Sequence, residues 1–323
     1  MFDRNMIFPK FRLGAPTPTN IFVVSANGAR RELQLTTDDR SEDPVWSPDS
    51  NKIAYIHFDE RGSPSKRPIW ISEVGLMDAD GKNQEQLASF QFGVGGPTLS
   101  WSPDGKTLAV SAITLEDVGD SKGFVENAIY LLDTASHKSP RLLIEKGFSP
   151  SWSPDGSQIV YTCSTEVRPG EFKGSVCVMG ATSHSAHRVL ADNALGPIWS
   201  PSGKHIAYLS LIRGKKQLVV CDPDGLNTIP LTEEKRDVQS FAWSPDGRRI
   251  AYTEKRPMDD DVIQSGPLHS RDVPRIFVTS LDGKRIGPFG EKDRLWCGNV
   301  SWSSDGKFLA AVCSSGLRDK TTR

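Results

Sequence analysis

The sequence of 323 residues has no long apolar run and no large charge of one sign. No stretch approaches the roughly 18 apolar residues that a membrane-spanning helix needs. Residues 1–12 contain no apolar run that could form the core of a signal peptide. The 39 Lys and Arg residues balance the 40 Asp and Glu residues, which argues against attraction of nucleic acid or anionic membranes by overall charge. We therefore expect a soluble, cytoplasmic protein that neither binds nucleic acid nor inserts into a membrane. If the N-terminus is truncated, a periplasmic or secreted protein is the alternative.

Cysteine is scarce and shows no metal-binding pattern. The five cysteines are odd in number, and no Cys-x-x-Cys spacing indicates a zinc or redox motif. The favoured interpretation is that they are reduced and buried, and that they act as small apolar residues. The alternative is a disulfide. Cys163 and Cys177 are then the expected pair, because they could face each other across neighbouring strands.

Known catalytic motifs are also missing. There is no Gly-x-Ser-x-Gly elbow of a serine hydrolase and no His-Glu-x-x-His zinc motif. The closest histidine pair, His184 and His187, lies at a predicted turn without a nearby thiolate or carboxylate. We expect no catalytic residue and no cofactor. The alternative is that Asp259, Asp260 and Asp261 hold Ca²⁺ or another divalent cation, although such charge runs are usually solvated loops.

What the sequence does contain is a repeat. The motif Trp-Ser-Pro-Asp-Gly, followed by a short apolar run, occurs six times with small variations. The tryptophans that begin successive copies are 55, 51, 47, 44 and 59 residues apart, so the repeat has a period of about 51 residues. The six copies begin at Trp46, Trp101, Trp152, Trp199, Trp243 and Trp302.

Each repeat predicts two β-hairpins. Proline, Asp and Gly after the Trp favour a tight turn, and the apolar run that follows is the return strand. Ser50, Ser202 and Ser304 depart from this motif and are expected to weaken individual turns. A second apolar strand, ending at another turn, lies upstream of every Trp. Four short antiparallel strands cannot bury both of their faces alone, so six repeats stacked around an axis predict an all-β, six-bladed β-propeller. We interpret the tryptophans as residues that pack the blades and not as a ligand cage.

These residues resemble a known family. Trp-Ser-Pro-Asp-Gly followed by Ile-Ala-Tyr, with an upstream apolar strand ending in Asp-Gly, resembles the WD40-like PD40 repeat of TolB-type propellers over roughly residues 20–315. The resemblance implies protein–protein interaction of the TolB type. Similar propellers are also found as gating domains of prolyl-oligopeptidase-like enzymes and in oligogalacturonide lyases. The enzymes of the first group carry their catalytic residues in a separate hydrolase domain, for which no room remains after residue 315.

The repeats divide the chain into three parts. Residues 1–19 form an N-terminal extension, residues 20–315 form a single propeller, and residues 316–323 form a C-terminal tail. The last repeat supplies two strands, and residues 21–36 supply two strands with no Trp before them. We therefore expect the N-terminal hairpin to complete the sixth blade, which would remove exposed sheet edges.

The connections between the second and third strands vary in length, whereas the other turns are uniform. The variable segments are 58–68, 113–127, 164–174, 211–217 and 254–275. Such variation marks one face as the working surface. We expect a monomeric, non-catalytic scaffold that binds a protein or peptide through this face or the channel mouth. The alternatives are a channel-sited metal-dependent lyase or hydrolase, or a gating propeller for a separate hydrolase chain. The candidate partner-binding residues are Arg213, Lys215, Lys216, Arg256, Asp259, Asp260, Asp261 and Arg271.

Overall fold

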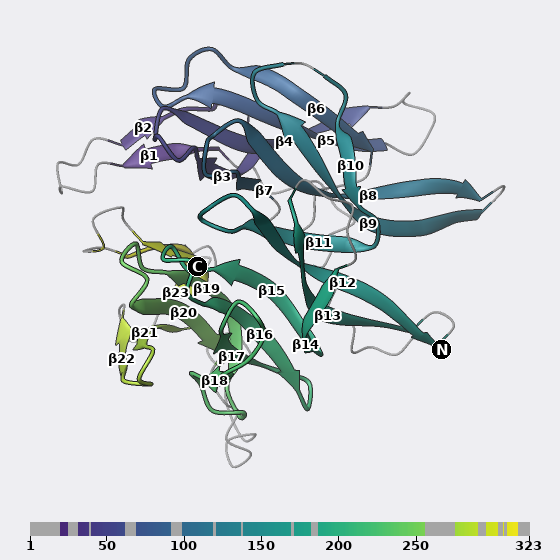
Figure 1. The fold of residues 1–323 in the computed structure, drawn as a ribbon. Coiled ribbons are helices and arrows are strands. Elements are labelled where there is room, and N and C mark those ends of the chain that lie inside the picture. The colour runs from purple at the N-terminus through teal and green to yellow at the C-terminus, as the bar shows by residue number, and fades with distance from the viewer. Residues whose placement is uncertain are drawn as a thin grey trace, which may run out of the picture. The chain divides into compact units, whose positions relative to one another are not determined.

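The structure is a computed structural model in which the described elements are β-strands joined by turns (Figure 1). Among the residues that the structure describes, no helix is long and apolar enough to cross a membrane. The described residues are 20–24, 32–38, 40–61, 69–91, 99–118, 121–136, 138–168, 171–181, 187–255, 275–289, 295–302, 306 and 309–315.

The chain divides into two units, residues 1–190 and 191–323. The first unit begins with a hairpin, β1 (Phe22–Val24) and β2 (Glu32–Gln34), and continues with three four-stranded antiparallel sheets. The first sheet is β3 (Ser41–Trp46), β4 (Lys52–Arg61), β5 (Ile69–Asp78) and β6 (Glu85–Gln91). The second sheet is β7 (Leu99–Trp101), β8 (Thr107–Val118), β9 (Ser121–Asp133) and β10 (Arg141–Ile144). The third sheet is β11 (Gly147–Trp152), β12 (Gln158–Arg168), β13 (Glu171–Gly180) and β14 (Arg188–Asp192).

The second unit holds two further four-stranded sheets and a second hairpin. The fourth sheet is β15 (Ala194–Trp199), β16 (Ile206–Ile212), β17 (Lys215–Cys221) and β18 (Ile229–Pro230). The fifth sheet is β19 (Asp237–Trp243), β20 (Arg249–Lys255), β21 (Arg275–Ser280) and β22 (Arg285–Phe289). The hairpin is β23 (Leu295–Trp302) and β24 (Leu309–Ser315).

The strand order confirms the predicted blade. In each of the five sheets, the Trp strand, the return strand, the apolar strand and the outer strand are neighbours in sequence order. The hairpins at residues 22–34 and 295–315 are also formed. They belong to different units, so the predicted closure of a sixth blade by the N-terminal hairpin stays a prediction.

The Ser residue of the repeat, and not its Pro and Gly alone, organises the hairpin turn. Ser102 is buried, and its hydroxyl donates to Asp104 at 2.6 Å while it accepts a hydrogen bond from the backbone N of Thr107 at 2.9 Å. Asp104 in turn accepts from the backbone N of Lys106 at 3.1 Å. The same pattern recurs at Ser47, Ser153 and Ser244. Because the Asp is acceptor-only when ionised, these hydrogen bonds hold its pKa below the ordinary value.

Neighbouring turns touch within each unit. A Cβ atom added to Gly105 would lie 3.9 Å from Pro48, and one added to Gly156 would lie 3.6 Å from Pro103. Both glycines have positive φ, as the sequence predicted. Ser50 replaces such a glycine and adopts φ 59°, a conformation that strains a residue with a side chain.

The cores lie between successive sheets. One cluster joins the first two sheets and includes Ala54, Val74, Leu108 and Leu132. Equivalent clusters join the second and third sheets, and the fourth and fifth sheets. The tryptophans take part in this packing: the indole nitrogens of Trp101, Trp243 and Trp302 donate to the backbone carbonyls of Val45, Ile198 and Ala242 on the preceding sheet. Trp101, Trp243 and Trp302 therefore pack the blades as expected, whereas Trp46 is 47% exposed.

Two expectations need correction. Most of segments 113–127, 164–174 and 211–217, expected to be variable connections, is strand, because β8 pairs with β9, β12 with β13, and β16 with β17 inside these segments. Cys163 and Cys177 form a disulfide across β12 and β13, with their Cα atoms 5.9 Å apart. The favoured interpretation of reduced thiols is thus wrong for this pair. Their alternation on adjacent strands brings both side chains into one buried face.

Candidate functional site

The tip of the β16–β17 hairpin carries three of the candidate basic residues. The strands pair up to Ile212 and Lys215, so Arg213 and Gly214 form a two-residue turn. Their φ angles, 48° and 78°, are both positive, as the type I′ turn of a tight hairpin requires. Arg213 and Lys215 are exposed at this tip, whereas Lys216 is partly buried.

The hairpin is tied to the segment that leads into β19. The Lys215 Nζ donates to the backbone carbonyl of Lys235 at 3.2 Å. The backbone N of Lys216 donates to the Asp237 carboxylate at 3.2 Å, and the Lys216 Nζ donates to Gln239 Oε1 at 3.4 Å. Burial lowers the pKa of Lys216, and the Asp237 carboxylate opposes this change. The two lysines are therefore held in place and are not freely mobile side chains.

A buried carboxylate lies beside this segment. Glu254 on β20 is 2% exposed, and its Oε1 atom accepts from Arg236 Nη1 at 3.0 Å and from Arg285 Nη2 at 2.5 Å. Its Oε2 atom is buried without a hydrogen-bond partner among the described residues. Burial raises the pKa of Glu254, while the two guanidinium groups lower it. One carboxylate thus fixes two arginines, Arg236 in the connection before β19 and Arg285 in β22.

Aromatic rings support the same cluster. The Arg285 guanidinium lies 3.6 Å from the centre of the Phe277 ring, and that ring stacks on Tyr252 at a centroid distance of 5.7 Å. Arginine favours such stacking because its charge is delocalised over a plane. Burial raises the pKa of Tyr252 to about 12, so this hydroxyl stays protonated over the physiological range.

We call the resulting feature the basic hairpin surface. Glu233 pairs with Lys235 at 2.7 Å and lies 3.8 Å from Arg236. Glu254 and Asp237 likewise neutralise part of the positive charge. Among the described residues more cations than carboxylates nevertheless gather here, so these residues carry a net positive charge. It consists of Arg213, Lys215, Lys216, Lys235, Arg236, Lys255 and Arg285, with Glu233, Glu234, Asp237 and Glu254.

The other candidate residues lie outside the described residues. These are Arg256, Asp259, Asp260, Asp261 and Arg271. The segment that contains them leaves β20 after Lys255 and enters β21 at Arg275. Glu254 and Arg275 are paired across these strands, so the described residues on either side of the segment lie at the same end of the fifth sheet. His184 lies outside the described residues too.

Sequence reasoning missed the residues that organise this surface. Glu254 was assigned to a variable connection, but it is the sixth residue of a strand and faces inward. An acidic residue soon after the return strand's apolar run is the signal that could have indicated it. Arg236 and Arg285 could not be linked to it, because they are 18 and 31 residues away along the chain.

The described residues contain no group of three or more His, Cys, Asp or Glu side chains arranged to hold a metal ion. This finding does not cover the Asp259–Asp261 run, where a cation was the alternative. Divalent-cation binding by that run stays a prediction.

Comparison with known proteins identifies the repeats. The family model described as the TolB β-propeller domain matches residues 15–215. The Tol-Pal system protein TolB of Alcanivorax borkumensis is 29% identical over 110 residues, which cover 34% of this chain and 23% of that protein. The curated relatives that were matched are thus spanned over about a quarter of their length or less.

Solved structures show the same fold. The putative TolB from Agrobacterium tumefaciens has a TM-score of 0.57 at 22% identity, and the match covers 88% of this chain and 94% of that one. An oligogalacturonate lyase in complex with manganese has a TM-score of 0.59 at 12% identity, with 93% and 79% covered. At these identities the likenesses establish a β-propeller and nothing finer.

Proposed function

Because the chain belongs to the TolB β-propeller family, we propose that it is a non-catalytic binding module that holds an acidic segment of a protein or peptide partner on the basic hairpin surface. The likeness to the lyase rests on the fold alone, so it carries no activity to this chain. A propeller suits a binding role because its rigid sheets hold the connections at their ends in fixed positions.

One observation carries the proposal: the cations of the basic hairpin surface are oriented before any partner arrives. Arg236 and Arg285 are fixed by Glu254, and Lys215 and Lys216 by acceptors near β19. Side chains that are already ordered lose less conformational entropy on binding, which favours affinity. Fixed guanidinium groups also match the planar geometry of carboxylates.

Fluorescence anisotropy with a labelled peptide of alternating Glu and Gly tests this function. We expect binding that weakens as salt is raised, and no binding of the matching Lys and Gly peptide. The Lys215→Glu variant should bind the acidic peptide roughly tenfold more weakly, since a favourable charge becomes a repulsive one.

Arg248→Glu is the matched control. Arg248 is exposed in the Ser-Pro-Asp-Gly turn, which joins β19 to β20 at the end opposite the basic hairpin surface. This variant should leave peptide binding unchanged. Equal losses in the Lys215 and Arg248 variants would show that net charge, and not this surface, governs binding, and the proposal would be wrong.

The Cys163–Cys177 disulfide bears on the compartment. Disulfides persist in oxidising compartments and are rare in the reducing cytoplasm. The bridge therefore does not support the expected cytoplasmic location. We propose that the protein works in an oxidising, extracytoplasmic compartment, and that its binding partner is found there.

A further inference from the structure

A small polar pocket lies in the first unit, separate from the basic hairpin surface. Its volume is about 230 Å³, below the several hundred Å³ that is typical of sites for drug-sized ligands. This size suits one side chain or a small amine. We call it the first-sheet pocket, and it is lined by Asp38, Tyr55, His57, Glu73, Gly75, Gln84, Glu85 and Gln86.

The strand register explains why these residues meet. Tyr55 on β4 is paired with Gly75 on β5, and His57 is paired with Glu73 two residues along. Gly75 is in turn paired with Gln86 on β6. Directly paired residues, and residues two apart on one strand, point to the same face of a sheet. One face of the first sheet thus presents all five.

Asp38 approaches that face from the connection between β2 and β3. Its carboxylate accepts from the backbone N of Arg40 at 2.9 Å and from the Ser41 hydroxyl at 2.7 Å. The His57 Nδ1 lies 3.3 Å from the same carboxylate. Asp38 is therefore held over the sheet by groups on both sides.

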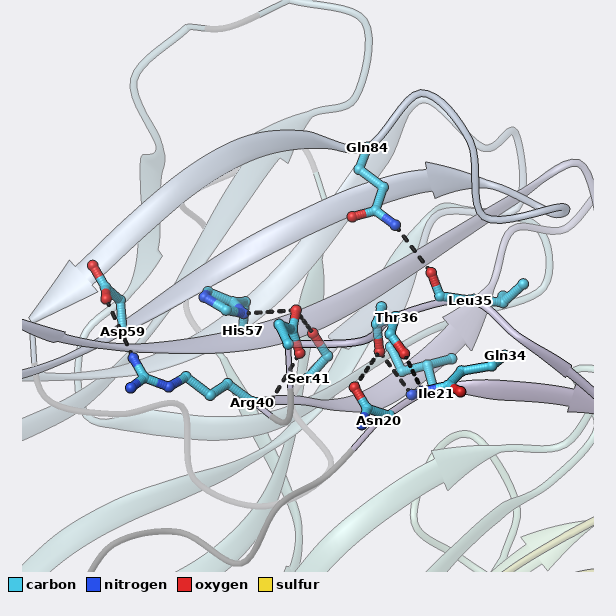
Figure 2. Close-up of polar contacts among 11 residues, drawn as sticks. Asn20, Ile21, Gln34, Leu35, Thr36, Arg40, Ser41, His57, Asp59 and Gln84 are labelled. Carbon is cyan, nitrogen blue, oxygen red and sulfur yellow. Dashed lines mark hydrogen bonds and ion pairs between the residues drawn. The ribbon is translucent and has the colours of Figure 1, made fainter.

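The two glutamine amides are fixed by their nitrogen atoms. Gln84 Nε2 donates to the backbone carbonyls of Leu35 and Gly81, both at 3.1 Å; its contact with Leu35 is drawn in Figure 2. Gln86 Nε2 donates to the Ser89 hydroxyl. Since each nitrogen is engaged, each amide oxygen remains as an acceptor.

Tyr55 supplies an independent observation. It is 6% exposed, and its ring packs with Ile21, Leu35 and Met77. Its side chain nevertheless lines the first-sheet pocket. A tyrosine hydroxyl can accept as well as donate a hydrogen bond, so this residue adds a polar atom to an otherwise acidic lining.

We propose that the first-sheet pocket binds a single alkylammonium or guanidinium group, supplied by a lysine or arginine side chain of a peptide or by a small free amine. The carboxylates of Asp38, Glu73 and Glu85 attract a cation, and the amide oxygens of Gln84 and Gln86 and the Tyr55 hydroxyl accept its N–H groups. Lys52, which lies 3.8 Å from Glu85 and is exposed by nearly half, leaves most of this negative potential in place.

Isothermal titration calorimetry tests the proposal on the full chain. The probes are N-acetyl-lysine methylamide, N-acetyl-arginine methylamide and 1,4-diaminobutane, with N-acetyl-norleucine methylamide as the uncharged isostere and CaCl₂ as a metal probe. We expect at least one organic cation to bind roughly tenfold or more tightly than the isostere. Binding of the amino-acid amides alone would identify a peptide side chain as the source, and binding of the diamine alone would identify a free amine.

Variants locate the binding. Tyr55→Phe and Glu73→Gln should each weaken binding of the cation roughly tenfold, since each variant loses a hydrogen bond or an ion pair to that charged group. Glu145→Gln, at an exposed carboxylate outside the pocket, should change nothing. Melting curves confirm that each variant is folded. The proposal is overturned if the isostere binds as well as the cations, if Ca²⁺ binds and the organic cations do not, or if Tyr55→Phe and Glu73→Gln behave like the control.

Discussion

The ring of Tyr55 lies directly against Gly75, its partner on the neighbouring strand. A Cβ atom added to Gly75 would collide with the Tyr55 ring near the carbon that bears the hydroxyl group. Glycine at this position therefore lets the ring cover the strand, as aromatic residues do for glycines in sheets. Both residues line the first-sheet pocket.

Gly75→Ala should consequently destabilise the protein by about 1–3 kcal/mol, because an extra methyl group overpacks a tight core. Urea unfolding measures the change. In a Tyr55→Ala background the same substitution should change the free energy of unfolding little, since the ring atoms with which the new methyl group collides are absent. An equal cost in both backgrounds would show that strand geometry, and not the ring, excludes alanine.

Acid should weaken the repeat turns. Hydrogen bonds from Ser and backbone N–H groups lower the pKa of Asp49 and of Asp155 from 3.8 to about 2. A carboxylate whose pKa is depressed in the folded state contributes stability above its unfolded pKa, and this contribution is lost as the pH falls toward 2. We expect the melting temperature to fall over this range. Asp155→Asn should show a smaller fall than the wild type when melting is followed from pH 5 to pH 2.

The tryptophan of the repeat has two roles that substitution can separate. Trp243 is 8% exposed, and its indole nitrogen donates to the carbonyl of Ile198 at 3.1 Å. Trp243→Phe keeps most of the apolar contact and should cost about 1 kcal/mol for the lost hydrogen bond. Trp243→Ala should cost about 3–5 kcal/mol. Trp46 is 47% exposed, so Trp46→Phe, measured in the same urea titrations, is a control that should change stability little.

The sequence was sufficient to predict the blades because each step was local. Proline, Asp and Gly at fixed positions predict a turn, and the turn sets which apolar residues pair. The register of β16 and β17, with Arg213 and Gly214 at the tip, follows from such local rules. The buried role of the Ser in the motif did not follow, because the hydroxyl contacts a backbone group five residues away that has no sequence preference.

The candidate sites depend on contacts between distant residues, and the sequence does not encode these in a local pattern. Glu254 contacts Arg236 and Arg285 because the end of β20, the connection into β19 and the start of β22 come together. Asp38 meets His57 because the N-terminal hairpin packs on the first sheet. Neither contact corresponds to a residue spacing that could be recognised in the sequence before the fold is known. The basic residues of the hairpin tip were predicted because a turn with several charges can be recognised in the sequence itself.

Glu254 should matter for stability as well as for the basic hairpin surface. Glu254→Gln keeps the shape of the side chain but removes the negative charge that Arg236 and Arg285 share. Both arginines are partly exposed, so solvent offsets some of the repulsion, and we expect a loss of about 1–3 kcal/mol in urea unfolding. The exposed Glu234→Gln is the control and should be neutral within about 0.5 kcal/mol. If the two variants behave alike, Glu254 does not stabilise the arginines.

The disulfide can be tested without knowledge of any partner. Cys163 and Cys177 are both buried and are joined across β12 and β13, which closes a loop with a sequence separation of 14. A bridge over a loop of this length stabilises the folded state by about 3 kcal/mol, through the entropy it removes from the unfolded chain. Cys163→Ser should lower the urea midpoint of unfolding accordingly. Addition of a reductant should lower the midpoint of the wild type but should not change that of the variant.

Peptide mapping without reduction provides the direct measurement. Protein purified under oxidising conditions should yield a linked peptide that contains both cysteines, while Cys221, a buried thiol, should be alkylated after denaturation. Five alkylated thiols in that protein would contradict the bridge. That result would also remove the argument for an oxidising compartment, because the location was inferred from this one covalent bond.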